Sequence, residues 1–151
     1  MNIAQSEIHR SYYRYTIVAD LEQIGIDEVY GIELENEEKI RRVHKLLDTI
    51  AFLYRDIRGR REDLKTIFAI GGVYDIKNPI FENALDVKNN RLVVGQIEGV
   101  MFEEFKDDTI CGLVEGKFDN DNEIKEKLDA LSMPDFFKQL KSRVKEYYEG
   151  N

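Results

Sequence analysis

The chain has 151 residues, of which 42% are hydrophobic and 34% charged, a composition that predicts one folded domain rather than a disordered chain. Its formal net charge is −8, which argues against a free-standing nucleic-acid binder, because such proteins are usually basic overall. It has no run of about 18 apolar residues, no signal-peptide pattern and a single cysteine, so we expect a cytoplasmic protein that contacts no membrane and has no internal disulfide.

The first predicted element is a long strand over residues 8–21, where side chains alternate with period two. The face that we expect to be buried carries Tyr13, Tyr15, Ile17, Ala19 and Leu21. The opposite face carries Arg10, Tyr12, Arg14 and Thr16. Two arginines that flank a tyrosine suit single-stranded nucleic acid, by charge and by stacking. The alternative is an exposed face, or one that another subunit covers.

The clearest predicted helix covers residues 36–54. Asn36 suits the cap position, and Glu37 and Glu38 suit the first turn. Apolar side chains then recur at helical spacing, at Ile40, Val43, Leu47, Ile50, Ala51 and Tyr54. The opposite face, which we expect to be exposed, is basic and carries Lys39, Arg41, Arg42 and Lys45.

Positive charge is concentrated between residues 39 and 65. Nine Lys or Arg and four acids give this block a charge of 9 − 4 = +5, so the rest of the chain carries −8 − 5 = −13. Its densest part is a predicted loop over residues 55–64, which combines arginines with Gly59. Guanidinium groups pair bidentately with phosphate, so one interpretation is an RNA or DNA backbone contact. The other is a solvated loop whose arginines pair with Glu62 and Asp63.

The remaining elements complete a mixed α+β domain. Residues 66–73 form an apolar run typical of a central strand. Weaker patterns predict strands at 91–94 and 109–114, a helical segment at 98–105 and an acidic turn at 119–122. A C-terminal helical segment is expected within residues 123–151, with Ser132 as a helix cap. The apolar face of that last helix carries Phe136, Phe137, Leu140, Val144, Tyr147 and Tyr148.

No group of residues predicts catalysis. His9 and His44 have no second ligand at metal-binding spacing, and Cys111 lies in an apolar stretch where a buried thiol is usual. No phosphate-binding or dinucleotide-binding glycine pattern is present. We therefore expect no enzyme, catalytic residue, metal or cofactor; a hydrolase that uses some of the many carboxylates is the weakest alternative.

The order of these features resembles a known family. Residues 2–21, the helix from Asn36, the arginine-glycine loop and the strand from Thr66 are similar to the C-terminal half of the backbone subunit of type I CRISPR surveillance complexes. The resemblance is closest to the DevR-type branch of subtype I-B, within the RAMP superfamily, and it covers the first half of the chain.

The resemblance implies a partial ferredoxin-like, RNA-recognition-motif-type fold with an antiparallel sheet and packed helices. It implies antiviral defence: several copies assemble along a CRISPR RNA (crRNA) with other Cascade proteins, and target DNA is contacted indirectly through the guide. The RNA-binding residues implied or suggested are Arg58, Gly59, Arg60 and Arg61, then Arg10, Arg14, Arg41 and Arg42.

The sequence departs from this family at three points. The first is the loop, where one glycine stands in place of the two that the family often has and Glu62 and Asp63 follow. The second is the third-strand aromatic signature, which is missing. The family's N-terminal half is also absent, so we expect a fragment or one part of a split subunit, with an open sheet edge unless residues 81–94 or a partner cover it. The alternative function is an assembly module of a CRISPR complex with no RNA affinity of its own.

Overall fold

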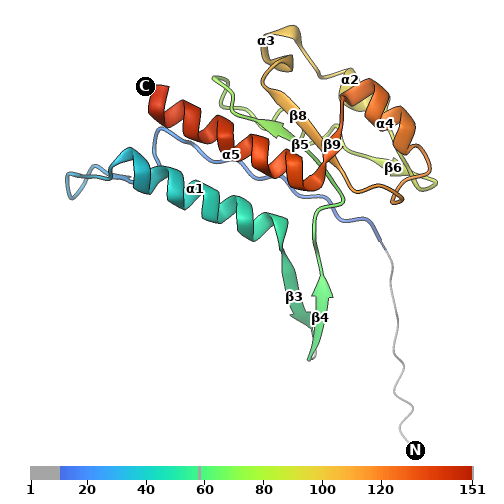
Figure 1. Ribbon diagram of the computed structural model, residues 1–151, viewed down its shortest axis with the longest axis horizontal. Coiled ribbons are helices and arrows are strands. Elements are labelled where there is room, and N and C mark those ends of the chain that lie inside the picture. The colour runs from blue at the N-terminus through green and yellow to red at the C-terminus, as the bar shows by residue number, and fades with distance from the viewer. Residues whose placement is uncertain (1–10, 58, 151) are drawn as a thin grey trace, which may run out of the picture.

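The computed structural model describes residues 11–57 and 59–150 and confirms the predicted α+β class (Figure 1). In chain order the elements are β1 (Ile26–Asp27), β2 (Ile32–Glu33), α1 (Asn36–Ala51), β3 (Tyr54–Ile57), β4 (Arg60–Asp63), β5 (Phe68–Gly72), β6 (Val87–Lys88), β7 (Arg91–Leu92), α2 (Val94–Glu98), α3 (Glu103–Lys106), β8 (Thr109–Leu113), α4 (Asp121–Leu128), β9 (Leu131–Ser132) and α5 (Met133–Gly150).

The central sheet has the order β5, β8, β9, with β8 antiparallel to β5 and parallel to β9. The predicted strands at 66–73 and 109–114 are confirmed as β5 and β8. The other strands pair as separate two-stranded ladders, β1 with β2, β3 with β4 and β6 with β7. β5 is therefore an edge strand within the described part of the chain.

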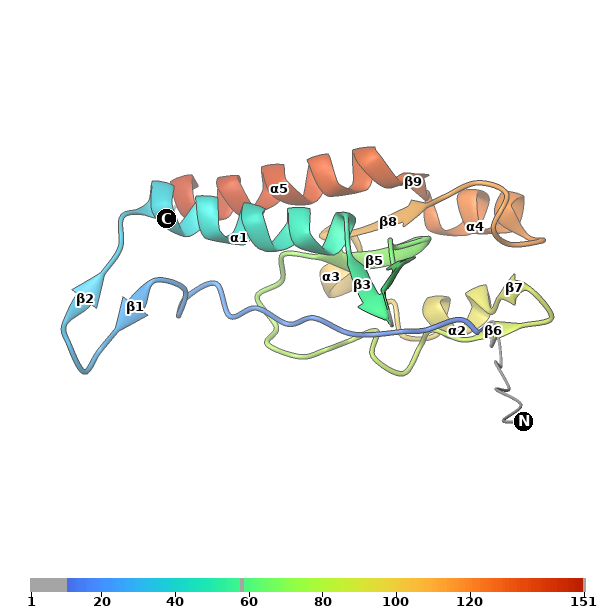
Figure 2. The ribbon, with the colours of Figure 1, turned by 90° about the horizontal axis from the view of Figure 1, so that it is seen from below.

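Two antiparallel helices, α1 and α5, lie side by side on one face of this sheet (Figures 1 and 2). Their apolar stripes meet β8 in a core that contains Val43, Leu47, Ile110, Phe136, Phe137, Val144 and Tyr148. The predicted stripes of both helices are thus confirmed as buried faces. Gly112 of β8 lets α5 approach closely, because a Cβ atom there would lie 2.6 Å from Cβ of Phe136.

The other face of the sheet carries a second core. Cys111 and Leu113 point into it, while Ile110 points toward the helices, as expected for alternating residues of one strand. The segments that complete this core are the β6–β7 ladder and helices α2, α3 and α4, and its most deeply buried members are Ile97 and Ile124. Cys111 is 3% exposed, which confirms the predicted buried thiol.

Helix α1 differs from the prediction at both ends. Glu35 occupies the cap position without a side-chain hydrogen bond, and Asn36 instead donates from Nδ2 to the carbonyl of Tyr148 at 2.6 Å. The helix ends at Ala51, because Tyr54 already belongs to β3. Lys39, expected on the exposed face, is buried and pairs with Glu33 at 2.9 Å.

In the second half of the chain, short elements replace the predicted ones. The strand expected at 91–94 is only two residues long, and the helix expected at 98–105 is two short helices separated by a bend. The acidic turn expected at 119–122 covers only residues 119 and 120, because α4 begins at Asp121. The cap at Ser132 is confirmed, since its Oγ accepts a hydrogen bond from the Asp135 amide at 3.3 Å.

The strand predicted over residues 8–21 is not formed in its described part. Residues 11–20 are extended, and residues 11–19 make no backbone–backbone hydrogen bond within the part of the chain that the structure describes. Neither face is buried: Tyr13 and Val18 are 76% and 62% exposed. The side chains alternate as in a strand, but no strand of the described residues pairs with this segment. We call residues 11–20 the extended segment.

Candidate nucleic-acid interface

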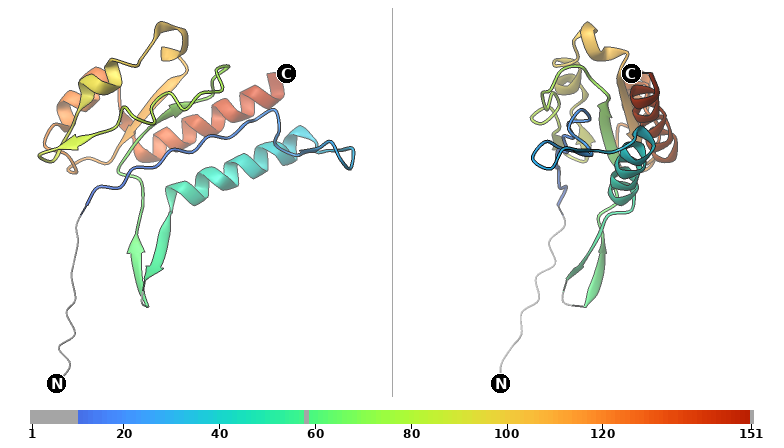
Figure 3. Two further views of the ribbon diagram at one scale, coloured as in Figure 1. Left: turned by 180° about the vertical axis from the view of Figure 1, so that it is seen from behind. Right: turned by 90° about the vertical axis from the view of Figure 1, so that its left-hand side faces the viewer.

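The predicted basic loop is a β-hairpin that projects from the end of α1 (Figures 1 and 3). Strands β3 and β4 pair antiparallel, with Ile57 opposite Arg60, so the chain reverses direction between these two residues. Gly59 has φ +77°, a left-handed conformation that favours glycine, and nothing lies within 4 Å of the position of a Cβ there. The glycine therefore permits the turn and leaves its surroundings open.

The register of the hairpin sorts its charges onto two faces. One face carries Tyr54, Asp56 and Arg61, and the other carries Arg55, Arg60 and Glu62. Arg61 pairs with Asp56 at 3.2 Å, and its guanidinium lies 4.3 Å from the centroid of the Tyr54 ring. Arg55 and Arg60 form no ion pair with any residue in the two described ranges.

The hairpin's own acids do not neutralise its arginines in the way the second interpretation expected. Asp63 pairs with Lys65 at 3.1 Å, and the Lys65 backbone amide and ammonium lower the pKa of Asp63. The Arg61–Asp56 pair is more than half exposed on both sides, so it adds little stability and can be exchanged for a phosphate contact. The hairpin thus presents its arginines to solvent.

The structure brings Arg60, Arg61 and Gly59 together with Arg55, which the site prediction omitted. The sequence offers no direct signal for Arg55, because the four charged residues of β4 carry no strand pattern and only the fold reveals the pairing with Glu62. Arg58 and Arg10, both predicted RNA contacts, lie outside the described residues, as does His9.

Arg41 and Arg42 lie elsewhere, on the first half of α1. Both bond to the Glu38 carboxylate, Arg41 at 2.6 Å and Arg42 at 3.0 Å. The hydrogen bonds from Arg41 and then Arg42 lower the pKa of Glu38 to about 2. At about 1.5 Å of rise per residue, Arg42 lies about 14 Å along the helix from Ala51, the last helical residue before the hairpin. These arginines form a separate surface.

The Tyr12 and Arg14 side chains are engaged within the chain. The Tyr12 ring stacks on Phe118 with 5.8 Å between centroids, and its hydroxyl donates to Oδ1 of Asn90. Arg14 donates to the carbonyl of Leu85 at 2.5 Å. Stacking of Tyr12 on a base would require these contacts to open, so the structure favours a structural use of this tyrosine.

Other candidate chemistry is weak. Desolvation raises the pKa of Cys111 to about 12, so the buried thiol stays protonated at neutral pH. His44 Nε2 hydrogen-bonds with the Lys141 carbonyl between α1 and α5 at 2.9 Å. Within residues 11–57 and 59–150, no three His, Cys, Asp or Glu residues gather as a metal site would require, and no helix is long and apolar enough to cross a membrane.

A comparison with protein-family models finds one family whose model matches the region that contains the hairpin. The model of the family described as CRISPR-associated negative auto-regulator DevR/Csa2 matches residues 1–89, which include α1, the hairpin and β5. No curated protein and no solved structure matches the chain. Because the family model covers more than half of the sequence, the chain belongs to the DevR/Csa2 family of CRISPR-associated proteins.

Proposed function

We propose that this chain is a non-catalytic, RNA-binding backbone component of a type I CRISPR surveillance complex. The observation that carries the proposal is the β3–β4 hairpin, which projects from the core and presents Arg55 and Arg60 without ion-pair partners among the described residues. Membership of a CRISPR-associated family supplies the biological setting.

The proposed ligand is the phosphate backbone of crRNA. A two-stranded ribbon with arginines on both faces can approach a nucleic-acid strand, and guanidinium groups match phosphate oxygens. In this proposal Arg58, Arg60 and Arg61 supply the charge, and Gly59 permits the turn. Arg10, Arg14, Arg41 and Arg42 remain weaker proposed contacts. Phosphate contacts carry no sequence information, so binding is expected to be independent of sequence.

The test is binding of a fluorescent repeat–spacer RNA and of an unrelated RNA of equal length across a salt series. We expect equal, salt-sensitive binding of both. Reversing charge at Arg58, Arg60 and Arg61 (R58E, R60E, R61E) should weaken both equally and lower the salt slope by about 2, at about 0.7 per lost phosphate contact for a single strand.

The matched control reverses three lysines on α3, α4 and α5, Lys106, Lys125 and Lys138 (K106E, K125E, K138E), and changes the net charge by the same amount. We expect it to lower affinity less than the hairpin variant does. Equal losses in the two variants would show that net charge, and not the hairpin, governs binding. Unchanged affinity in the hairpin variant would reject the assignment.

A second candidate function is an assembly module that contacts neighbouring subunits, either copies of the backbone subunit or other Cascade proteins. The observation that favours it is the β1–β2 hairpin, whose tip exposes Val29 and Tyr30 at 87% and 78%. Large apolar side chains that project this far commonly mark protein contacts. Under this alternative the chain binds no RNA on its own, and Val29→Ser with Tyr30→Ser would reduce subunit association. Target DNA would be contacted only through the guide.

A further inference from the structure

The two faces of the β3–β4 hairpin differ in how their charges are balanced. On the face that carries Tyr54, Asp56 pairs with Arg61 at 3.2 Å. Asp63 lies opposite Tyr54 and pairs with Lys65 at 3.1 Å. Both acids of this face therefore have a cationic partner, whereas the two described arginines of the opposite face have no ion-pair partner among the described residues. We call Tyr54, Asp56 and Arg61 together the aromatic face of the hairpin.

The Arg61 guanidinium is held on two sides. Its Nε donates to Oδ1 of Asp56 at 3.2 Å and its Nη2 donates to Oδ2 at 3.5 Å, so one edge of the planar group is bound to the carboxylate. Its Cζ lies over the Tyr54 ring, 4.3 Å from the ring centroid, so one flat side of the group is bound to the ring. Because 66% of the Arg61 side chain is exposed, the opposite flat side is open to solvent.

This arrangement suits stacking on a base better than a bidentate phosphate contact. A guanidinium binds phosphate through N–H groups that lie in its plane, and two of its nitrogens already bond to Asp56. It binds a nucleobase through its flat side, which the ion pair leaves free. The Tyr54 ring and the Asp56 carboxylate also restrict the Arg61 side chain, so less conformational entropy is lost when a base stacks on it.

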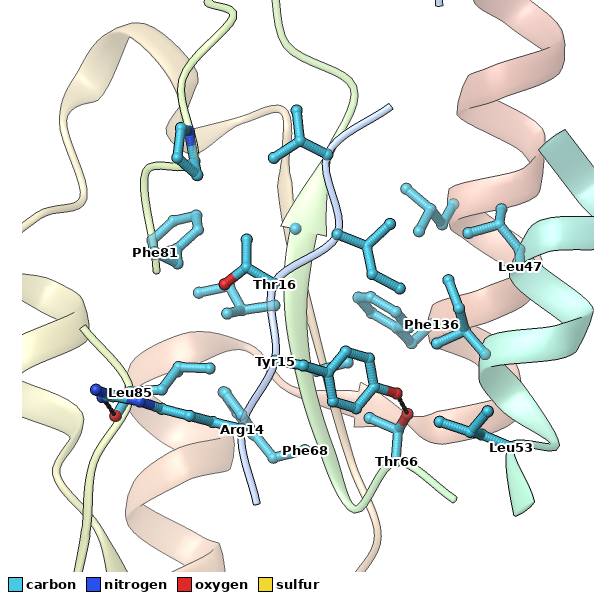
Figure 4. A pocket seen from close by; sticks show the side chains of 18 of the residues that line it. Arg14, Tyr15, Thr16, Leu47, Leu53, Thr66, Phe68, Phe81, Leu85 and Phe136 are labelled. Atoms are coloured by element: carbon cyan, nitrogen blue, oxygen red, sulfur yellow. Dashed lines mark hydrogen bonds between the residues drawn. The ribbon is translucent and has the colours of Figure 1, made fainter. Parts of the chain in front are cut away.

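The hairpin holds the aromatic face away from the core on a fixed base. The Leu64 amide donates to the Leu53 carbonyl at 3.0 Å, which adds a backbone hydrogen bond below Tyr54. The Tyr15 hydroxyl hydrogen-bonds with Oγ1 of Thr66 at 3.4 Å, and Figure 4 shows Tyr15 and Thr66 at this base with Leu53. Tyr54, the residue after Leu53, is nevertheless 54% exposed. The aromatic face is thus anchored at one end and accessible to a ligand.

We propose that the aromatic face binds a nucleobase of single-stranded RNA, which stacks on the open side of the Arg61 guanidinium and continues the stack of Arg61 on Tyr54. This inference rests on the proposed RNA-binding function and extends it from phosphates to bases. Arg55 and Arg60 on the opposite face contact phosphates of neighbouring nucleotides, and the charge of Arg61 still attracts the backbone. Because every base has a flat π surface, such stacking accepts any base and binding stays independent of sequence.

The test compares fluorescent oligouridine with its abasic counterpart, in which every nucleotide keeps its ribose and phosphate and lacks the base. Both RNAs carry the same number of phosphates, so counterion release contributes equally to their binding. We expect the full chain to bind oligouridine at least about fivefold more tightly, the lower end of what stacking of one base contributes. Equal, salt-sensitive binding of the two RNAs would overturn this inference and leave the proposed phosphate contacts standing.

Variants that conserve charge assign the base to Arg61. Arg61→Lys keeps the positive charge and loses the flat guanidinium, so most of the preference for oligouridine should disappear. Tyr54→Leu removes the ring beneath the guanidinium and should act in the same direction. Arg60→Lys is the matched control, because it makes the same change on the opposite face, and it should affect both RNAs equally. An unaltered preference in Arg61→Lys, or an equal loss of preference in Arg60→Lys, would refute the assignment.

NMR of the arginine side chains locates the bound base in the unaltered chain. The ring current of a base stacked on the guanidinium should shift the Arg61 Nε–H proton upfield. We expect this shift with oligoadenosine, whose base has a larger ring current than uracil, and no such shift with the abasic RNA, whereas Arg55 and Arg60 should respond to both RNAs. Equal responses of Arg61 to both RNAs would overturn the inference. If neither RNA bound, the proposed function would fail together with it.

Discussion

Gly112 provides the sharpest test of the packing that positions the helical layer. In Gly112→Ala, the new Cβ would lie 2.6 Å from Cβ and 2.8 Å from Cγ of Phe136, a residue that is 3% exposed. Carbon atoms in contact prefer at least about 3.5 Å, so α5 must move from the sheet by about 1 Å. Overpacking of this kind costs about 1–3 kcal/mol of unfolding free energy.

For a chain of this length, each kcal/mol lowers Tm by about 2–4 °C, so the expected decrease is about 2–12 °C. Thermal and urea unfolding of the variant would measure it. The matched control is Gly71→Ala on the neighbouring strand, where no atom lies within 4 Å of a new Cβ and where we expect little change. If both variants unfolded at the same temperature, the close approach of α5 to β8 would be refuted.

Three further predictions concern other parts of the molecule. Ile124→Ala removes a fully buried side chain and should cost about 2–5 kcal/mol in urea unfolding, whereas Ile32→Ala, at a 51% exposed position, should cost far less; equal costs would contradict the second core. Cys111 should resist iodoacetamide at pH 8 in the folded protein and react on unfolding, because burial raises its pKa to about 12; rapid alkylation without denaturant would contradict this. The pKa of Glu38, about 2, lies below its ordinary value of 4.5, so its contribution to stability is present above pH 4.5 and is lost as pH falls toward 2. In Arg41→Gln, NMR titration should show the Glu38 pKa rising toward 4.5, and an unchanged pKa would mean that the ion pair does not form in solution.

Elements whose signal is local could be predicted from the sequence. The apolar periodicity of α1 and α5 and the continuous apolar run of β5 depend on residues within a few positions of each other. Ser132 likewise caps α5 through a partner three residues away. Such patterns can be recognised in the sequence regardless of how the rest of the chain folds.

The errors arose where distant segments decide the outcome. The alternation in the extended segment is that of a strand, but a strand also needs a neighbour, and within the described residues no strand pairs with this segment. The helical pattern predicts that Lys39 is exposed. In the structure the β1–β2 hairpin places Glu33 beside Lys39, and the lysine is buried. Asn36, the predicted cap of α1, instead donates to the carbonyl of Tyr148. None of these partners is visible within a local window.

The candidate site shows the same division. Counting charges located the basic block in the sequence. The four residues of β4 are all charged and carry no strand pattern, so residues 55–64 were predicted to form a loop. Pairing across the hairpin then decided which arginine is neutralised, because register places Asp56 opposite Arg61 and leaves Arg60 opposite Ile57. The sequence therefore indicated where cations gather, and only the fold showed how they are presented.

A backbone hydrogen bond at its base fixes the β3–β4 hairpin to the rest of the fold. The Leu64 amide donates to the Leu53 carbonyl at 3.0 Å, which closes the hairpin between the end of α1 and the start of β5. The direction in which the arginines project therefore depends on how α1 and β5 are held.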